Sequence, residues 1–494
     1  MTSDDVVEPV APEAECRDCG YEPELKRTLG GFQVFAVSFA FISVAVGIFA
    51  TYDDMLATSG PVGIWLWLFA AVGQALVALV VAQFAARIAL SGSSYQWASR
   101  LANPKIGWLF GWLTFWYLAT AVVALDNALA SQAFMPLFGI APNEDTARML
   151  TVAILVVQAV LVIASTRLLG MITSSAVGVE LGIIVVLVVA LVAVMIFTGS
   201  GDLGNLTSRG ITAADPSYFA IGGGLMAGMI MGLTTLVGFD SAANLAEEAK
   251  DPFRSVPRAI VASVVAAGVL GFVFLLVLTA AIEDVTAVSA SGSPVAAIIR
   301  SQLGSVAERI LLAGLAFAMF GAGMVVMAAC SRQVFAMARD KRFPAHGMMR
   351  RVNPRTQTPV PATILILVVG LVLMLALPGA ALVQLIVAST ILPALIYGAI
   401  VILYLAVRRR LDHRVGGFSL GRLEVPVAVA ALIWEVLVLF VLVTPGDATV
   451  PTLVVVGLIL AGGVYFAYML FLHSEVLDVE AADDLSAPTP DTTK

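Results

Sequence analysis

The chain has 494 residues, of which 60% are hydrophobic and only 12% are charged. Soluble globular proteins carry about 25% charged residues, so this composition excludes a soluble fold and predicts a multi-pass membrane protein. The formal net charge of −7 gives no support to nucleic-acid binding, and three cysteines are too few for a disulfide framework.

The first thirty residues are polar and acidic, which is not the pattern of a cleavable signal peptide. They contain one C-x-x-C unit, formed by Cys16 and Cys19. A zinc site needs two further ligands, and the tail supplies none. We therefore interpret the pair as ordinary tail sequence, with a metal or redox pair as the alternative, and we predict neither a bound metal nor a cofactor.

Apolar runs long enough to cross a hydrocarbon core of ~30 Å recur about twelve times along the chain. We predict spans at 31–57, 61–87, 106–137, 147–167, 171–198, 218–246, 257–282, 306–338, 358–378, 380–406, 424–444 and 450–472. An even number places both termini on one side, and that side carries most of the Lys and Arg residues of the loops. By the positive-inside rule both termini are expected in the cytoplasm. We also predict that the protein lies in the plasma (inner) membrane.

Two of these spans contain residues that disfavour a continuous helix. The first places Ser43 and Gly47 at mid-membrane, and the sixth contains Gly228, Gly232 and Gly238. We predict that both helices break part-way across the bilayer, which frees backbone groups to hold a ligand. The alternative for the sixth span is a helix-packing face of small residues.

A broken membrane helix exposes its half-helix ends at mid-membrane. The N-terminal end of the outer half of the first span suits a carboxylate, and carbonyls at the sixth break suit an ammonium. The carboxylate side is predicted to consist, mainly through its backbone, of Ser43, Val44, Ala45 and Gly47. The amine side is predicted to consist of Thr234, Thr235, Leu236 and Gly238.

Four acidic residues lie within predicted spans, and ionisable groups at this depth are functional candidates. Asp126 is predicted either to hold a substrate cation or to bond a neighbouring helix. Asp240 is predicted to couple or gate proton movement, or else to bridge helices as a fixed polar group. Glu180 is a second proton-coupling candidate, because a buried carboxyl can exchange a proton near neutrality. Glu435, in the eleventh span, is expected to be structural.

A dense group of charges follows the sixth span and faces a second run of charges that ends the eighth. Charges of both signs exceed what topology needs, so we predict an inner gate of salt bridges that re-form in each cycle. The alternative is a solvated loop. The predicted gate residues are Glu247, Glu248, Lys250, Arg254 and Arg339.

The stretch GFDSAANLAEEAKDPFRSVPRAI, beginning at Gly238, resembles the segment after the discontinuous sixth helix of amino acid–polyamine–organocation (APC) permeases. SRQVFAMARDKRFP, from Ser331 to Pro344, resembles the cytoplasmic end of their eighth helix. The likeness is strongest to the amino acid/choline transporter branch, which includes γ-aminobutyrate and choline permeases. Residues 91–97 resemble the family's short cytoplasmic loop, either a gate or a plain connector. Many relatives carry an aromatic residue at the position of Thr234, and its absence suggests more room for a longer or bulkier amine.

The resemblance implies an all-α polytopic membrane protein with a 5+5 inverted repeat and discontinuous helices 1 and 6, the leucine-transporter-like fold. Residues 31–198 form the first repeat and 218–406 the second. The remaining segments are cytoplasmic tails at 1–30 and 473–494, an extracellular loop at 199–217, a cytoplasmic loop at 407–423, and two peripheral helices at 424–472.

These features predict a secondary transporter that moves an amino acid or a related amine, such as γ-aminobutyrate, choline or a polyamine, by alternating access. Proton symport is expected, because the eighth span lacks the hydroxyl groups that a sodium site would use. Exchange or facilitated diffusion is the alternative mechanism, and a permease-like nutrient receptor is the alternative of another class. The sequence contains none of the motifs of the enzymes considered, so we do not expect catalysis.

Overall fold

The computed structural model describes residues 25, 27–141, 143–291, 293–376, 379–411, 418–444, 448–472 and 474–478, without the side chains of 379–388. The Cys16–Cys19 pair and most of both predicted tails lie outside these residues. Within them the regular structure is helical, apart from one isolated bridge between Leu29 and Ala249.

The twelve predicted spans are all represented in the described residues. Ten helical segments are long and apolar enough to cross a membrane, and two shorter apolar segments, 224–235 and 360–376, correspond to the sixth and ninth spans. The unbroken spans are α4 (Ile64–Ala85), α6 (Pro104–Ala128), α8 (Glu144–Ala164), α9 (Thr166–Thr198), α13 (Pro252–Ala280), α16 (Ser305–Arg339), α18 (Val360–Ala376), α19 (Gly379–Val407), α20 (Glu424–Val443) and α21 (Thr449–Leu472). The third span continues from α6 through a π-helical turn (Leu129–Phe134) into α7 (Met135–Leu137).

The first and sixth spans are both broken, as the sequence predicts. The first divides into α2 (Gly31–Ile42) and α3 (Val44–Thr58) at Ser43, whose φ of 41° is left-handed. The sixth consists of α10 (Gly224–Gly228) and α11 (Ile230–Thr235), then an irregular stretch, then the short α12 (Ser241–Asn244). Gly238 has a φ of 79°, a conformation that glycine adopts without strain.

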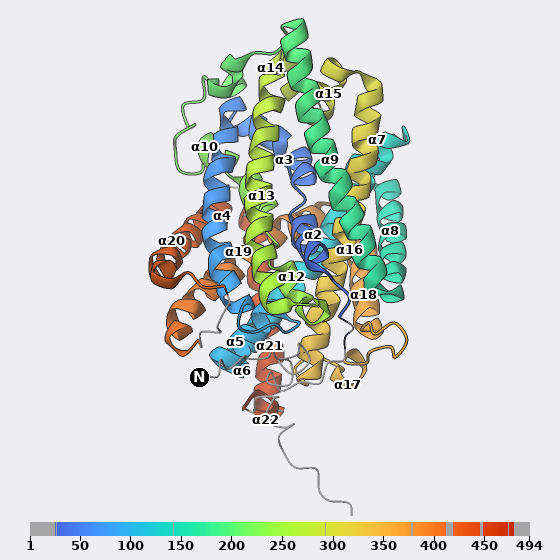
Figure 1. The fold of residues 1–494 in the computed structure, drawn as a ribbon, viewed down its shortest axis with the longest axis vertical. Coiled ribbons are helices and arrows are strands. Elements are labelled where there is room, and N and C mark those ends of the chain that lie inside the picture. The colour runs from blue at the N-terminus through green and yellow to red at the C-terminus, as the bar shows by residue number, and fades with distance from the viewer. Residues whose placement is uncertain are drawn as a thin grey trace, which may run out of the picture.

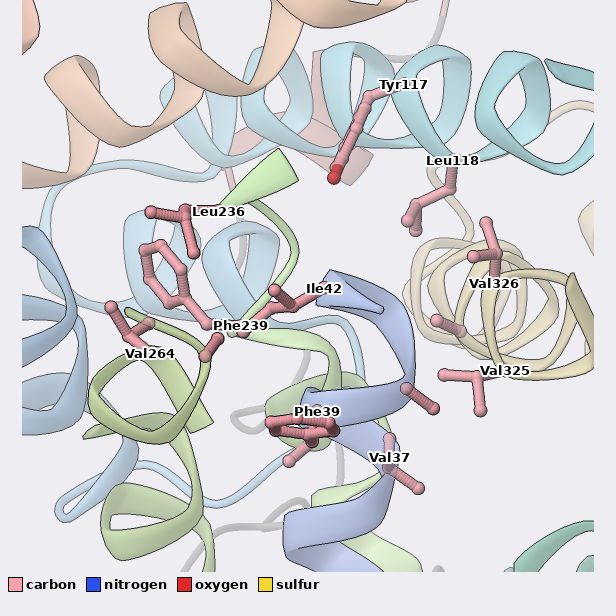
Figure 2. Close-up of a cluster of buried hydrophobic side chains, with 14 of the residues drawn as sticks. Val37, Phe39, Ile42, Tyr117, Leu118, Leu236, Phe239, Val264, Val325 and Val326 are labelled. Carbon is pink, nitrogen blue, oxygen red and sulfur yellow. The ribbon is translucent and has the colours of Figure 1, made fainter. Parts of the chain in front are cut away.

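The broken spans lie inside the bundle, where other helices cover their freed backbone. The helix α2 packs against α9, α13 and α16, and α11 packs against α3 and α4. Figure 2 shows the result at the breaks: Ile42 at the end of α2 lies beside Leu236 and Phe239 of the sixth span. Tyr117 of α6 and Val326 of α16 approach from other sides (Figure 2). Burial by neighbouring helices is the condition under which irregular backbone is tolerated at membrane depth.

Short helices cap the two ends of the bundle (Figure 1). One end carries α14 (Val285–Ser289) and α15 (Pro294–Leu303), and the opposite end carries α5 (Ser93–Leu101), α17 (His346–Met349) and α22 (Ser474–Asp478). Most of the predicted 91–97 loop is therefore helical. Residues 93–99 are buried, so α5 is a packed element and not a solvated connector.

Candidate functional site

The two breaks are in direct contact, through positions where only glycine fits. A Cβ atom added to Gly47 of α3 would overlap the side chain of Thr235 at the end of α11. A Cβ added to Gly238 would overlap the ring of Phe41 on α2. These glycines of the predicted substrate site therefore let the broken spans approach each other closely.

The N-terminal end of α3 is bound by a carboxyl group of the protein itself. Oε1 of Glu180, on α9, accepts a hydrogen bond from the main-chain N–H of Ala45 at 2.9 Å and from the Ser43 hydroxyl at 3.2 Å. The Glu180 side chain is only 2% exposed. A carboxylate at this position is stabilised by the freed amides and by the helix dipole. The sequence predicted Ser43 and Ala45 for the carboxylate side and Glu180 separately for proton coupling, and the structure brings all three together.

Asp240 connects the sixth break to two other elements. Its Oδ1 accepts from the hydroxyl of Tyr397 on α19 at 2.7 Å, and its Oδ2 accepts from the hydroxyl of Ser93 on α5 at 3.3 Å. The Tyr397 hydroxyl in turn accepts from the N–H of Gly238 at 3.0 Å. One tyrosine thus satisfies the amide and the acid that flank the break, and sequence reasoning gave no signal for it.

The α2 half of the first span is also bonded to the sixth break. The hydroxyl of Ser38 donates to the carbonyl of Phe239 at 2.7 Å and accepts from the N–H of Ala242 at 3.4 Å. A buried carbonyl without a hydrogen-bond partner costs free energy. The Ser38 hydroxyl supplies the partner that the carbonyl of Phe239 would have had in an intact helix. The α2 half of the first span and the segment after the sixth break are therefore joined by side-chain hydrogen bonds as well as by packing.

The two threonines predicted for the amine side form hydrogen bonds within their own helix. The hydroxyls of Thr234 and Thr235 donate to the carbonyls of Ile230 and Met231, at 2.9 Å and 2.7 Å. Leu236 is fully buried among the apolar side chains of the break (Figure 2). Val44 is likewise fully buried, and its side chain lies against Gly271 of α13. The roles of these residues toward a substrate stay predictions.

Asp126 bonds a neighbouring helix, which was the second of its two predicted roles. Its Oδ1 accepts from Nε2 of Gln158, on α8, at 2.8 Å, and Gln158 also donates to the carbonyl of Phe320 on α16. Its Oδ2 is buried without a partner among the described residues. A Cβ on Gly323 of α16 would overlap the pair, so these groups are packed between three helices.

Glu247 and Arg339 form one of the predicted inner-gate ion pairs. Arg339, at the end of α16, donates through both terminal nitrogens to the two oxygens of Glu247, at 3.0 and 3.2 Å. The same carboxylate accepts from the main-chain N–H of Ser91 at 3.0 Å. Both side chains are largely buried. The pair therefore joins the exit of the sixth span to the eighth span and to the segment before α5.

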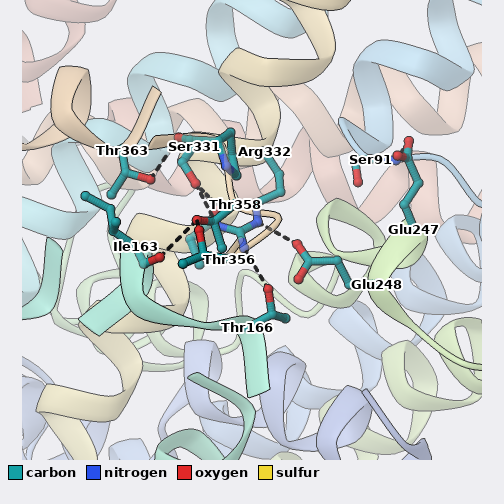
Figure 3. Close-up of polar contacts among 12 residues, drawn as sticks. Ser91, Ile163, Thr166, Glu247, Glu248, Ser331, Arg332, Thr356, Thr358 and Thr363 are labelled. Atoms are coloured by element: carbon teal, nitrogen blue, oxygen red, sulfur yellow. Dashed lines mark hydrogen bonds and ion pairs between the residues drawn. The ribbon is translucent and has the colours of Figure 1, made fainter. Parts of the chain in front are cut away.

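Glu248 pairs with Arg332, which lies in the motif from Ser331 to Pro344 and was not among the predicted gate residues (Figure 3). Nε of Arg332 lies 2.7 Å from Oε1 of Glu248, and both side chains are fully buried. Arg332 also donates to Thr166 of α9. The carbonyl of Glu248 accepts from the N–H groups of Thr28 and Leu29, which ties the segment before α2 to the same place. An arginine within the last turns of the eighth span was the available sequence signal.

The other two predicted gate residues are placed differently. Lys250 and Arg254 are exposed, and neither forms an ion pair with any residue that the structure describes. Positions 250 and 254 lie beyond the turn that buries Glu247 and Glu248, so solvent replaces the partner that the charge pattern suggested. Neither residue is therefore part of the ion-paired cluster in this structure, and their role in a gate stays a prediction.

Glu435 lies on α20 beside Trp434 and is almost completely buried. Neither of its carboxyl oxygens has a hydrogen-bond partner among the described residues. Trp434 packs against Gly73 of α4 and against the ring of Phe69. Its Cβ lies against Gly398 of α19, the neighbour of Tyr397, but its carboxyl forms no hydrogen bond to either break, so it can serve as a reference carboxyl for experiments.

Replacement of Tyr397 with phenylalanine is expected to loosen the sixth break. The variant removes the donor to Asp240 and the acceptor for the N–H of Gly238, so two buried polar groups lose their partner. Each such loss costs about 1–3 kcal/mol. Thermal unfolding of the purified protein in lipid nanodiscs checks this, with Tyr465→Phe as the matched control because that side chain packs with aromatic rings. Equal unfolding temperatures for the two variants would contradict the assignment.

Comparison with known proteins agrees with this architecture. The model of the amino acid permease family matches residues 29–464. The amino-acid permease BAT1 of Arabidopsis thaliana is 27% identical over 92% of this chain and 93% of its own length. A putative polyamine transporter of Candida albicans is 26% identical over 73% of this chain and 68% of its own. The GABA-specific permease of Saccharomyces cerevisiae is 27% identical over 69% and 62%.

The family match covers most of the chain, including both broken spans and both inner-gate ion pairs. It confirms the APC resemblance and indicates a transporter of amino acids or amines, not an enzyme. With its long apolar helices, this is a multi-pass membrane protein. The chain belongs to the amino acid permease family.

Proposed function

We propose that this protein is a secondary active transporter that couples the uptake of an amino acid or amine to protons by alternating access, in the plasma (inner) membrane with both termini cytoplasmic. The observation that supports this most is the contact of two broken spans, where the buried Glu180 carboxyl holds a freed N–H of the first span and the Tyr397 hydroxyl holds one of the sixth. A site of this kind binds a small charged guest without many charged side chains.

Asp240 is the proton-exchanging group of this proposal. Both of its oxygens accept from hydroxyl groups, of Tyr397 and Ser93, and a hydroxyl can turn from donor to acceptor when the carboxyl takes up a proton. A neutral carboxyl also accepts more weakly than a carboxylate. Protonation therefore loosens the links from the sixth break to α5 and α19, and it does so at the break itself.

The inner gate completes the cycle. In the described conformation the Glu247–Arg339 and Glu248–Arg332 pairs connect the sixth-span exit to α16. Opening of the cytoplasmic path requires these pairs to separate, and their re-formation closes it. Sodium is not the coupling ion of this proposal.

Transport into proteoliposomes tests the proposal. With γ-aminobutyrate and putrescine as probes, an inward proton gradient should drive accumulation and a sodium gradient at constant pH should not. Asp240→Asn should abolish accumulation but keep counterflow of preloaded substrate, because the amide oxygen still accepts from Tyr397. Glu435→Gln, which removes another buried carboxyl that forms no hydrogen bond to either break, should show normal accumulation. Accumulation driven by sodium alone would overturn proton coupling.

Two alternatives have distinct outcomes in the same assay. An exchanger or facilitator gives counterflow in the wild type and no accumulation under any gradient. A permease-like receptor binds its ligand and gives neither counterflow nor accumulation.

A further inference from the structure

Two buried side chains between α6, α8 and α16 each leave one oxygen without a hydrogen-bond donor. Gln158 donates through Nε2 to Oδ1 of Asp126 at 2.8 Å and to the carbonyl of Phe320 at 3.2 Å. Both side chains are fully buried, and neither Oδ2 of Asp126 nor Oε1 of Gln158 has a partner among the described residues. Buried polar atoms are normally hydrogen-bonded, so two unpartnered oxygens in one contacting pair call for a physical reason.

The orientation of the Gln158 amide is determined by its neighbours. Its nitrogen donates to the carbonyl of Phe320 as well as to Asp126. If the amide were turned over, its oxygen would face the carbonyl of Phe320, which has no proton to give. The nitrogen therefore stays where it is, and Oε1 remains an acceptor that needs a donor.

No cation among the described residues is placed to pair with an Asp126 carboxylate. On α16 the basic residue nearest to the pair is Arg332, which is already in an ion pair and lies more than two helical turns, or about 13 Å, from Gly323. On α8 it is Arg148, which lies more than two turns from Gln158. An ionised Asp126 would thus be a buried charge without a partner, a state that a carboxyl group avoids by taking up a proton.

The other titratable groups of the surrounding helices do not contact Asp126. The helix α18 and the π-helical turn contain none. Tyr397 of α19 donates to Asp240, and α5 and α21 contact α6 near Gly107 and Trp108, several turns away from Asp126. The remaining titratable residues of α6, α8, α16 and α19, none of which forms a hydrogen bond or ion pair with Asp126, are Lys105, Glu144, Asp145, Glu308, Arg309 and Arg339 toward helix ends, and Tyr117, Cys330 and Tyr404.

We propose that Asp126 carries a proton on Oδ2 and donates it to Oε1 of Gln158, so that the two side chains form a neutral acid–amide pair. One proton satisfies both unpartnered oxygens, because a protonated carboxyl has a donor on one oxygen and an acceptor on the other, as an amide has on its nitrogen and oxygen. The pair is a proton-binding site separate from Asp240. It depends neither on a substrate nor on the proposed function.

Infrared spectroscopy of the purified full-length protein, in an ester-free detergent at about pH 7, tests this directly. A protonated carboxyl has a C=O stretch distinct from that of a carboxylate, and an ordinary aspartate is protonated in roughly one molecule in a thousand at this pH. The difference spectrum of wild type minus Asp126→Asn should show a band equal to about one protonated carboxyl per protein. Labelling aspartate with carbon-13 at its side-chain carboxyl should move this band in the wild type, and Glu435→Gln should leave it in place.

A second variant tests whether the proton is shared with Gln158. Gln158→Met keeps the length of the side chain and removes both the donor to Oδ1 and the acceptor for the proton. The Asp126 band should remain and move to higher frequency, because its C=O group loses its hydrogen bond. Gln74→Met, which changes another buried glutamine, on α4, should not move the band.

A wild-type spectrum without a carbon-13-sensitive acid band would overturn the inference, and it requires no variant to fold. This is the result expected if Asp126 is ionised and an ordered water bridges the two oxygens. A band that survives Asp126→Asn belongs to another acid, and a band that does not move in Gln158→Met belongs to a proton that Gln158 does not share. Either result would also refute the acid–amide pair.

Discussion

Arg332→Ala is expected to destabilise the protein by about 3–5 kcal/mol, the usual result of removing one partner from a buried ion pair. Arg332 and Glu248 are both fully buried at 2.7 Å, and Oε2 of Glu248 already lacks a partner. Without the guanidinium, the carboxylate would remain in the interior with no cation beside it. Thermal and denaturant unfolding in nanodiscs measure the loss.

Two further variants separate this effect from a general response to losing an arginine. Arg300→Ala removes a partner from an exposed pair with Glu308 and should change stability little, because surface pairs contribute little. The double variant Arg332→Met with Glu248→Leu should recover much of the loss, since it removes both charges and keeps the packing. If Arg332→Ala unfolds at the wild-type temperature, the pair does not hold α16 to the sixth-span exit.

The membrane architecture was predictable because it depends on composition over long windows. Apolar runs of about twenty residues have few alternatives to a membrane helix, so the spans were found with their approximate ends. The broken spans were predicted for a related reason. Ser43, Gly47 and Gly238 interrupt otherwise apolar stretches of sequence, and such residues in a membrane span indicate a break or a binding site. The family comparison then confirmed the fold class.

The partners of the site residues were not predictable in the same way. Glu180 and Ala45 are 135 positions apart, and Tyr397 and Asp240 are 157 apart. Local pattern carries no information on such pairs, which depend on how the helices are rotated and packed. The sequence therefore identified Glu180 and Asp240 as buried acids but gave neither their hydrogen bonds nor the role of Tyr397.

The charge pattern of the sequence also did not predict which charged residues of the inner gate are buried. Glu247, Glu248, Lys250 and Arg254 look equivalent in the sequence, yet the first two are buried and paired while the last two are exposed. The turn before α13 separates them. Arg332 was missed for a different reason: it lies inside an apolar span, whereas the positive-inside rule counts only the charges of the loops.

Gly47→Ala is expected to impair ligand binding more than any other single methyl addition in the first span. The new Cβ would overlap Cγ2 and Oγ1 of Thr235, so the two breaks would have to move apart. Overpacking of this kind costs about 1–3 kcal/mol, and here the displaced atoms belong to the predicted site. Equilibrium binding of 4-aminobutyrate and unfolding temperature should both fall relative to the wild type.

The chain provides a matched control and a rescue for this variant. Gly182→Ala, on α9, adds the same methyl group where no atom lies within 4 Å, and should bind ligand normally. Thr235→Gly removes every atom that the new Cβ would overlap, so in the background of Gly47→Ala it should restore part of the affinity, and a double-mutant cycle should show strong coupling between the two positions. Independent effects of the two substitutions would mean that the breaks do not meet in the binding-competent state. The close approach at Gly47 would then belong to a conformation that binds no ligand.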